Sequence, residues 1–215
     1  MQKNSDIDFV NTNIPDLIEL YGESVVNDIL SDFSCPKNKD VAYFLKNKAL
    51  TMEKADYRGS RTYLIGFLND EGGFNLCAYY TLANKPFELN PDLSNSRKKE
   101  LRGKYSTTPN AVSAVLIGQL SKNFNHGYEY LLSGRDLITL AINSMKPTYD
   151  SVGLEIVFLE CEDTPKLRRF YEDTGFELYV DKDGKPIRSL HGGNNESELL
   201  IYFAKYKTLK VNLPL

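Results

Sequence analysis

Two apolar segments of strand-like composition, separated by an amphipathic helical pattern, constrain the fold more than any other feature of this sequence. The segments are AVSAVLIGQL, residues 111–120, and GLEIVFLEC, residues 153–161. Between them, apolar residues from Leu137 to Met145 recur at helical spacing after Gly134. Strand, helix and strand in this order predict a β-α-β unit with a right-handed crossover. The sheet is therefore expected to contain a parallel pair of strands.

The rest of the chain adds helices and antiparallel strands to this unit. The further predicted elements are helices over 14–30, 39–55 and 165–174, a hairpin of strands over 62–68 and 75–83, and strands over 176–180 and 198–206. Asn38 and Thr164 are the predicted caps of the second and last of these helices. The polar stretch 90–110 is expected to be a loop or a short helix. Since no linker divides the chain, we expect an α/β fold with a mixed sheet, in a single domain over residues 1–215.

The few cysteine and histidine residues exclude several classes of site. Cys35, Cys77 and Cys161 are odd in number and widely separated, so neither a disulfide framework nor a zinc knuckle is predicted. His126 and His191 are the only histidines in the sequence. We therefore expect no metal site, and three reduced, buried cysteines.

The charge balance and the hydropathy pattern narrow the class of protein further. No segment approaches the roughly 20 apolar residues that span a bilayer, and the first residues carry no signal-peptide pattern, so a cytoplasmic protein without membrane association is expected. A formal charge of -3 and a pI near 5.5 disfavour non-specific binding to nucleic acid. A polyanion would have to bind a local basic patch, and the segment from Arg97 to Lys104 is a candidate.

The common motifs of phosphate binding, hydride transfer and acyl-enzyme chemistry are absent from the sequence. After the second apolar strand, however, the predicted helix ends in FYEDTGF, residues 170–176. This ending, and the upstream segments FSC, FLKNKA, SRTY and YYTLA in the same order, make the chain similar to the GNAT acetyl-CoA-dependent N-acetyltransferases. Within that superfamily the chain resembles the branch that includes bacterial toxins acetylating aminoacyl-tRNA.

The resemblance implies a mostly antiparallel sheet with a central parallel pair that splays apart to hold acetyl-CoA. The pantetheine arm would pair with the backbone of Leu120, Ser121 and Lys122. The family's glycine-bearing loop has no clean counterpart between Lys122 and Leu137. Backbone N–H groups at a helix N-terminus nevertheless stabilise a bound anion. The predicted cofactor contacts are Leu120, Ser121, Lys122, Ser133, Gly134, Arg135, Asp136 and Thr164.

Two residues are candidates for the acid and the base of acetyl transfer. Tyr171 matches the family tyrosine that protonates the departing thiolate, and its alternative role is packing against the sheet. Glu160 ends the second apolar strand and is the candidate base. Glu162 and Asp163 are more simply explained by the positive end of the following helix. Cys161 is expected to be a packing residue, because direct transfer is usual in the family.

The sequence alone does not determine which amine accepts the acetyl group. A small-molecule amine, a peptide N-terminus or a lysine is the first interpretation, and aminoacyl-tRNA is the alternative that the toxin resemblance implies. A third interpretation is a GNAT-fold interaction module without catalysis, because fold alone does not determine function. The same resemblance implies two further partners, which are a second copy of the chain in a homodimer and a small ribbon-helix-helix antitoxin.

Overall fold

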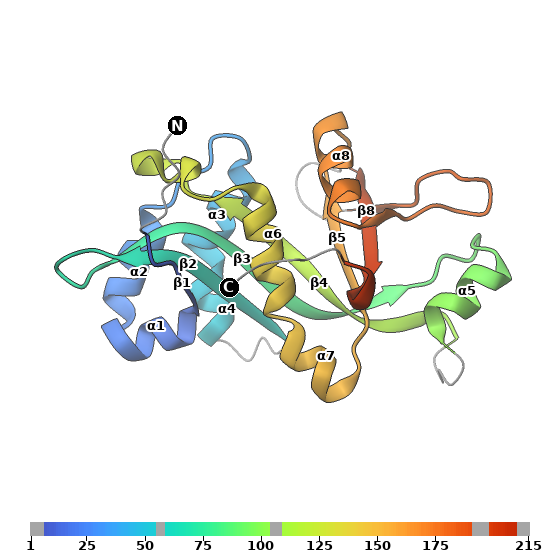
Figure 1. The fold of residues 1–215 in the computed structure, drawn as a ribbon, viewed down its shortest axis with the longest axis horizontal. Coiled ribbons are helices and arrows are strands. Elements are labelled where there is room, and N and C mark those ends of the chain that lie inside the picture. Colours follow the sequence, from blue (N-terminus) through green and yellow to red (C-terminus); the bar gives the residue numbers. More distant parts are fainter. Residues whose placement is uncertain (1–6, 55–58, 104–108, 191–197, 210–215) are drawn as a thin grey trace. The chain divides into compact units, whose positions relative to one another are not determined.

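A computed structural model of the chain describes residues 7–54, 59–103, 109–190 and 198–209. Figure 1 shows the helices and strands of these residues. They belong to two compact units. Unit 1 consists of residues 1–83 and 118–141, and unit 2 of residues 84–117 and 142–215. The single domain over residues 1–215 stays a prediction. No helix among the described residues is both long and apolar enough to cross a bilayer.

Unit 1 is built on antiparallel strands with several short helices. Its strands are β1 (Val10–Asn13), β2 (Ser60–Leu68), the first part of β3 (Phe74–Glu88) and the last part of β4 (Ala111–Lys122), hydrogen-bonded in the order β1-β2-β3-β4. Its helices are α1 (Ile14–Tyr21), α2 (Glu23–Ser31), α3 (Lys39–Phe44), the π-helix η1 (Leu45–Ala49), α4 (Leu50–Lys54), the 3-10 segment η2 (Asn125–Tyr130) and most of α6 (Gly134–Asn143). The predicted hairpin of residues 62–68 and 75–83 is confirmed, and both of its strands are longer than expected.

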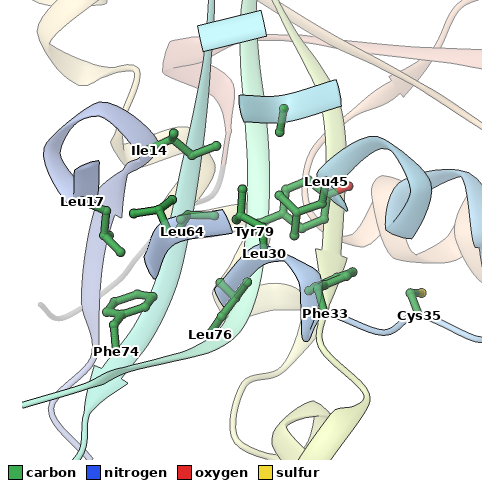
Figure 2. Close-up of a cluster of buried hydrophobic side chains, with 12 residues drawn as sticks. Ile14, Leu17, Leu30, Phe33, Cys35, Leu45, Leu64, Phe74, Leu76 and Tyr79 are labelled. Carbon is green, nitrogen blue, oxygen red and sulfur yellow. The ribbon is translucent and has the colours of Figure 1, made fainter. Parts of the chain in front are cut away.

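The core of unit 1 lies between these helices and the strands β2 and β3 (Figure 2). Leu17, Leu30 and Leu45 from three helices meet Leu64 and Tyr79 from the two strands, and all five side chains are buried. The Tyr79 hydroxyl donates a hydrogen bond of 2.6 Å to the carbonyl oxygen of Val41. A buried phenol thus gains the hydrogen-bond partner that burial requires, and it fixes α3 to the sheet.

Unit 2 has its own core and a second group of strands. Its elements are the end of β3, the start of β4, β5 (Ile156–Cys161), β6 (Glu177–Leu178), β7 (Arg188–Leu190), β8 (Glu198–Lys205), α5 (Asn95–Arg102), α7 (Lys146–Val152), α8 (Pro165–Asp173) and the 3-10 turn η3 (Tyr206–Thr208). The strand order is β4-β5-β8-β6, with β7 also paired to β8. The aromatic rings of Phe87, Phe158, Tyr179 and Phe203 form the centre of the core.

The parallel pair expected from the two apolar segments is confirmed. β4 and β5 are parallel and pair from Ala114–Ile156 to Ile117–Leu159. The other paired strands for which a register is defined run antiparallel. This mixed sheet is the predicted α/β architecture.

The observed elements depart from the predicted ones in five places. The first predicted helix is two helices, because Gly22 between them adopts a φ of 80°. The short strands β1 and β7 and the helix α7 were not predicted, and the last-but-one strand is reduced to Glu177–Leu178. Short edge strands depend on the neighbour that completes their hydrogen bonds, so they leave little periodic signal.

Candidate functional site

The predicted site residues fall on both units, and each set is described within its own unit. Unit 1 holds those at the end of β4 and at the start of α6: Leu120, Ser121, Lys122, Ser133, Gly134, Arg135 and Asp136. Unit 2 holds those at the end of β5 and on α8: Glu160, Thr164 and Tyr171.

The end of β4, residues 118–122, is a strand segment in unit 1. The parallel pairing stops at Ile117, whereas β4 continues through Leu120 and Ser121 to Lys122. Backbone N–H and C=O groups along such a strand are suited to an extended amide-bearing ligand, which would bind as an added strand does. The family resemblance predicts that the pantetheine arm pairs with this backbone.

Lys122 has a role inside the chain. Its ammonium group donates hydrogen bonds to the carbonyl oxygens of Glu129 and Leu132, the latter at 3.0 Å. These carbonyls lie in the segment between β4 and α6, where the resemblance led us to look for a glycine-bearing loop. Lys122 therefore holds this segment in shape by charge-assisted hydrogen bonds.

A second anchor of the same segment is Asn123, whose side chain is buried. Asn123 Oδ1 accepts hydrogen bonds from the amides of Ser34 and Asn125, at 2.9 and 3.1 Å, and its Nδ2 donates to the Leu76 carbonyl at 2.9 Å. The chain then turns through His126, whose φ is 58°. The segment is thus a loop held by fixed hydrogen bonds.

The N-terminus of α6 is closed by a reciprocal cap. The Asp136 amide donates to Ser133 Oγ at 3.1 Å, and the Ser133 amide donates to Asp136 Oδ2 at 2.8 Å. This is the arrangement of a capping box, with Asp in place of the usual Glu. The carboxylate of Asp136 therefore already interacts with the positive end of the helix, which makes it a cap as well as a predicted cofactor contact. Arg135, beside it, is exposed.

Tyr171 lies on α8 of unit 2 with 8% of its surface exposed. Its ring is edge-on to Phe170 and Phe176 and lies 5.6 Å from the ring of Tyr202. Among the described residues none hydrogen bonds to its hydroxyl. Burial, followed by the influence of Cys161, raises the pKa of Tyr171 well above its usual value. The hydroxyl therefore stays protonated at neutral pH and remains able to donate a hydrogen bond.

Glu160 and Tyr171 lie on opposite faces of the sheet in unit 2. Glu160 is paired with Ile201 of β8, whereas Tyr202, which contacts Tyr171, is paired with Leu159. Neighbouring residues of a strand point to opposite faces, and directly paired residues share a face. The structure therefore does not bring the two predicted catalytic side chains together on one face.

The polar residues before α8 have structural roles. Thr164 Oγ1 accepts a hydrogen bond from the Leu167 amide, which confirms it as the cap of this helix. Asp163 pairs with Arg168 and Arg188 at 2.6 Å each, and hydrogen bonds from the two guanidinium groups lower the pKa of the Asp163 carboxyl to about 2. Burial raises the pKa of Cys161 to about 12. A thiol with such a pKa is a poor nucleophile, in agreement with its predicted packing role.

Comparison with known proteins finds similarity in structure only. No protein-family model and no curated protein matches the sequence. A tyrosine-to-phenylalanine mutant of the toxin AtaT has a similar solved structure, with a TM-score of 0.61 and 20% identity over 97% of this chain and 94% of that chain. The chain has the GNAT fold.

Two further similar solved structures contain ligands. AtaTR bound with acetyl-CoA has a TM-score of 0.58 at 21% identity, covering 93% of this chain and 95% of that chain. AtaT complexed with acetyl-methionyl-tRNA has a TM-score of 0.58 at 21% identity, covering 90% of this chain and 94% of that chain. The parallel β4–β5 pair is the part of the GNAT fold on which the sequence resemblance placed the cofactor.

Sequence reasoning missed one polar arrangement in unit 1. His126 Nε2 lies 3.0 Å from Asp32 Oδ2, and the ring of His126 lies 5.3 Å from that of Tyr128. These residues border a hollow of about 330 Å³, together with Asp28 and Asn75. No signal in the sequence places residue 32 beside residue 126, because the contact is long-range.

Residues 97–102 of the basic segment singled out in the sequence lie in the helix α5, whereas Lys104 lies outside the described residues. Two cations of α5 are used within unit 2. Arg97 pairs with Glu100 and with Glu177, and its guanidinium lies over the ring of Phe203. The Lys98 ammonium donates to the carbonyl of Pro91 at 2.6 Å. This segment is therefore less available to an external polyanion than its composition indicated.

Proposed function

We propose that this protein transfers an acetyl group from acetyl-CoA to the α-amino group of an aminoacyl-tRNA. The observation that carries the proposal is the GNAT fold with its parallel β4–β5 pair, shared over most of the chain with structures that contain acetyl-CoA or an acetylated aminoacyl-tRNA. The extended backbone of β4 from Leu120 to Lys122 supports an extended pantetheine arm there. The acceptor would place the protein in the cytoplasm.

In the proposed reaction the neutral amine attacks the carbonyl carbon of the thioester. A new C–N bond forms, the C–S bond breaks, and the amine loses one proton. Tyr171 is the proposed donor of a proton to the leaving thiolate, supported by its protonated hydroxyl, to which no described residue hydrogen bonds. Glu160 is the proposed acceptor of the amine proton, directly or through water. Because the attacking nitrogen and the leaving sulfur are bonded to the same carbon atom, the position of Glu160 on the opposite face from Tyr171 leaves the route through water for the amine proton.

The proposed contacts of the pyrophosphate are the backbone N–H groups at the start of α6, from Ser133 to Asp136. In this arrangement Arg135 adds a positive charge and Asp136 a negative one. The carboxylate therefore weakens the anion site by repulsion, while the rest of the helix N-terminus favours it.

The experiment that tests the proposed function is ligand-dependent thermal stabilisation followed by a transfer assay. We expect acetyl-CoA to raise the melting temperature by a few degrees and ATP to leave it unchanged, because a ligand that binds only the folded state stabilises it. Radiolabelled acetyl groups should then appear on charged tRNA. If acetyl groups appear only on small amines, peptide N-termini or lysines, the protein is still an acetyltransferase, but its acceptor is not aminoacyl-tRNA.

A second candidate function is a GNAT-fold interaction module that does not bind acetyl-CoA. The specific observation in its favour is the Asp136 carboxylate at the N-terminus of α6, where the cofactor phosphates would otherwise bind. This function predicts no stabilisation by acetyl-CoA at any concentration. The same thermal experiment therefore separates the two functions.

A further inference from the structure

The basic side chains of unit 1 that have no anionic partner among the described residues are concentrated on one segment. Lys37, Lys39, Lys46 and Lys48 are exposed, and in the part of the chain that the structure describes none of the four ammonium groups forms an ion pair. By contrast, Lys54 pairs with Glu23, and Arg61 pairs with Glu53. Between residues 33 and 52, Asp40 is the only acidic residue. A local positive potential therefore remains on a protein whose formal charge is -3.

The π-helix that follows α3 determines how these lysines are presented. Leu45 and Ala49, at its two ends, are fully buried. The three residues between them, Lys46, Asn47 and Lys48, are all exposed. Single-turn π-helices of this kind occur frequently at functional sites. The wide turn is thus anchored by two apolar residues and presents two of the four ammonium groups to solvent.

Tyr43 adds an aromatic surface to the same segment, with 58% of its area exposed. The Lys48 ammonium lies 5.6 Å from the centre of its ring. A large exposed aromatic side chain beside several cations is the combination that binds single-stranded nucleic acid, in which bases stack on the ring while phosphates meet the charges.

The segment is held rigidly to the rest of unit 1. The Tyr79 hydroxyl donates to the carbonyl of Val41, and Asn38 Oδ1 accepts from the amides of Asp40 and Val41, which caps α3. The Lys37 ammonium lies 4.8 Å from the ring centre of Phe124. Binding therefore requires little ordering of the backbone, which reduces the entropic cost.

We propose that this lysine face, defined as Lys37, Lys39, Lys46, Lys48 and Tyr43, binds the phosphate backbone of RNA and stacks an unpaired base on Tyr43. The inference rests on the proposed function, for which it names the surface that holds the tRNA. It also assigns that role to α3 and η1 in place of α5, because the α5 cations Arg97 and Lys98 are engaged within unit 2. The lysine face supplies none of the proposed cofactor or catalytic residues.

The test compares charge removal on this face with the same change elsewhere. The probe is bulk aminoacylated tRNA, and its binding is measured by fluorescence anisotropy at several salt concentrations. For Lys39→Gln/Lys46→Gln we expect the dissociation constant to rise about 10-fold or more at ~0.1 M salt, and the log–log salt slope to become less steep by about two. The matched control is Lys182→Gln/Lys185→Gln, two exposed lysines beside Asp181 and Asp183. It should bind as the unchanged protein does.

A second variant tests the stacking part. Tyr43→Leu keeps every charge, and we expect it to weaken tRNA binding about 5-fold or more while binding of a DNA duplex of equal length is unaffected. The proposal would be overturned if the lysine variant and its control lost tRNA affinity equally. It would also be overturned if either test variant bound tRNA as tightly as the unchanged protein does. Failure of the unchanged protein to bind tRNA would overturn it as well.

Acetyl-CoA stabilisation of the same preparations keeps this inference separate from the proposed function. If acetyl-CoA stabilises the protein but tRNA does not bind, RNA binding by the lysine face is overturned. The protein is then an acetyltransferase of another amine. Lysine-dependent tRNA binding without stabilisation by acetyl-CoA supports the lysine face and overturns the proposed catalysis.

Discussion

Ser133 and Asp136 cap one another at the start of α6, with hydrogen bonds of 3.1 Å from the Asp136 amide and 2.8 Å from the Ser133 amide. A carboxylate in the first turn stabilises a helix, because it interacts with the partial positive charge of the N-terminal N–H groups. The same interaction opposes a second anion. The helix start therefore combines good local stability with a reduced affinity for phosphate.

The first prediction follows from this conflict. Asp136→Asn keeps an oxygen acceptor for the Ser133 amide but removes the negative charge, so acetyl-CoA binding should tighten by about two- to five-fold, most clearly at low salt. Isothermal titration calorimetry at two ionic strengths measures the effect. Asp40→Asn, in the first turn of α3, is the matched control and should leave the affinity unchanged. Weaker binding by Asp136→Asn would remove the start of α6 from the pyrophosphate site.

The second prediction concerns Tyr171. Tyr171→Phe should bind acetyl-CoA as the unchanged protein does, while turnover falls by about 10- to 10⁴-fold, as loss of a general acid does. Because no described residue hydrogen bonds to the hydroxyl, removing it should not lower the melting temperature. Tyr202→Phe is the control, since its hydroxyl lies 3.2 Å from Glu172 and its ring contacts that of Tyr171. Full turnover by Tyr171→Phe would leave the tyrosine a packing role only.

The pH dependence gives a separate check on the same residue. Burial raises the pKa of Tyr171 above its usual value near 10, so the acid form persists as the pH rises. Turnover should therefore show no alkaline loss from this group between about pH 7 and pH 10. A fall in kcat within that range that is present in the unchanged protein and absent in Tyr171→Phe would contradict the assignment.

The parts of the fold that the sequence predicts are those with strong periodicity or explicit caps. The β-α-β unit follows from the apolar runs of β4 and β5, and Asn38 and Thr164 cap helices as expected. The break at Gly22 was missed because apolar residues continue the helical stripe on both sides of it. The strands β1 and β7 were missed because each is short and receives its stability from a neighbour.

The site was predictable to a smaller extent, since charge compensation depends on long-range contacts. Arg97 looked available in the sequence, and only the folded chain brings Glu177 to it. The lysines of α3 and η1 can be read from the sequence. The sequence does not show, however, that none of them forms an ion pair with a described acidic side chain. The opposite orientations of Glu160 and Tyr171 likewise follow from strand register and ring contacts, which composition and spacing do not contain.

The third prediction uses the ion pairs of Asp163 with Arg168 and Arg188, which join the start of α8 to β7. The folded-state pKa of Asp163 is about 2, below its ordinary value of 3.8, so the pairs stabilise the fold above about pH 4 and lose this effect as the pH falls through 2. Asp163→Asn should therefore lower the melting temperature at pH 7 and make little difference near pH 2. Glu162→Gln, one residue earlier and exposed, is the control for thermal unfolding at both pH values. A difference between variant and unchanged protein that is the same at both pH values would argue against the ion pairs as its source.

The fourth prediction concerns Gly66 in β2, where the register with β3 shifts between Ile65 and Gly66. A Cβ at this position would lie 2.2 Å from the carbonyl oxygen of Asn75 and 2.6 Å from Cζ of Phe74, whose ring is buried in the core of unit 1. One contact is backbone and the other a packed ring, so neither can give way without separating β2 from β3. Gly66→Ala should therefore reduce the free energy of unfolding by about 2 kcal/mol or more in urea titrations.

The matched control for Gly66 is Gly72, which has a φ of 80° and, among the described residues, no atom within 4 Å of the point that an alanine methyl group would occupy. Gly72→Ala incurs only the backbone strain of a left-handed residue, about 1 kcal/mol. The two alanine variants thus separate steric conflict from loss of glycine's conformational freedom. If both variants lose the same free energy of unfolding, β2 and β3 can move apart at Gly66 at little cost. The close approach of the two strands would then not be the reason for glycine at this position.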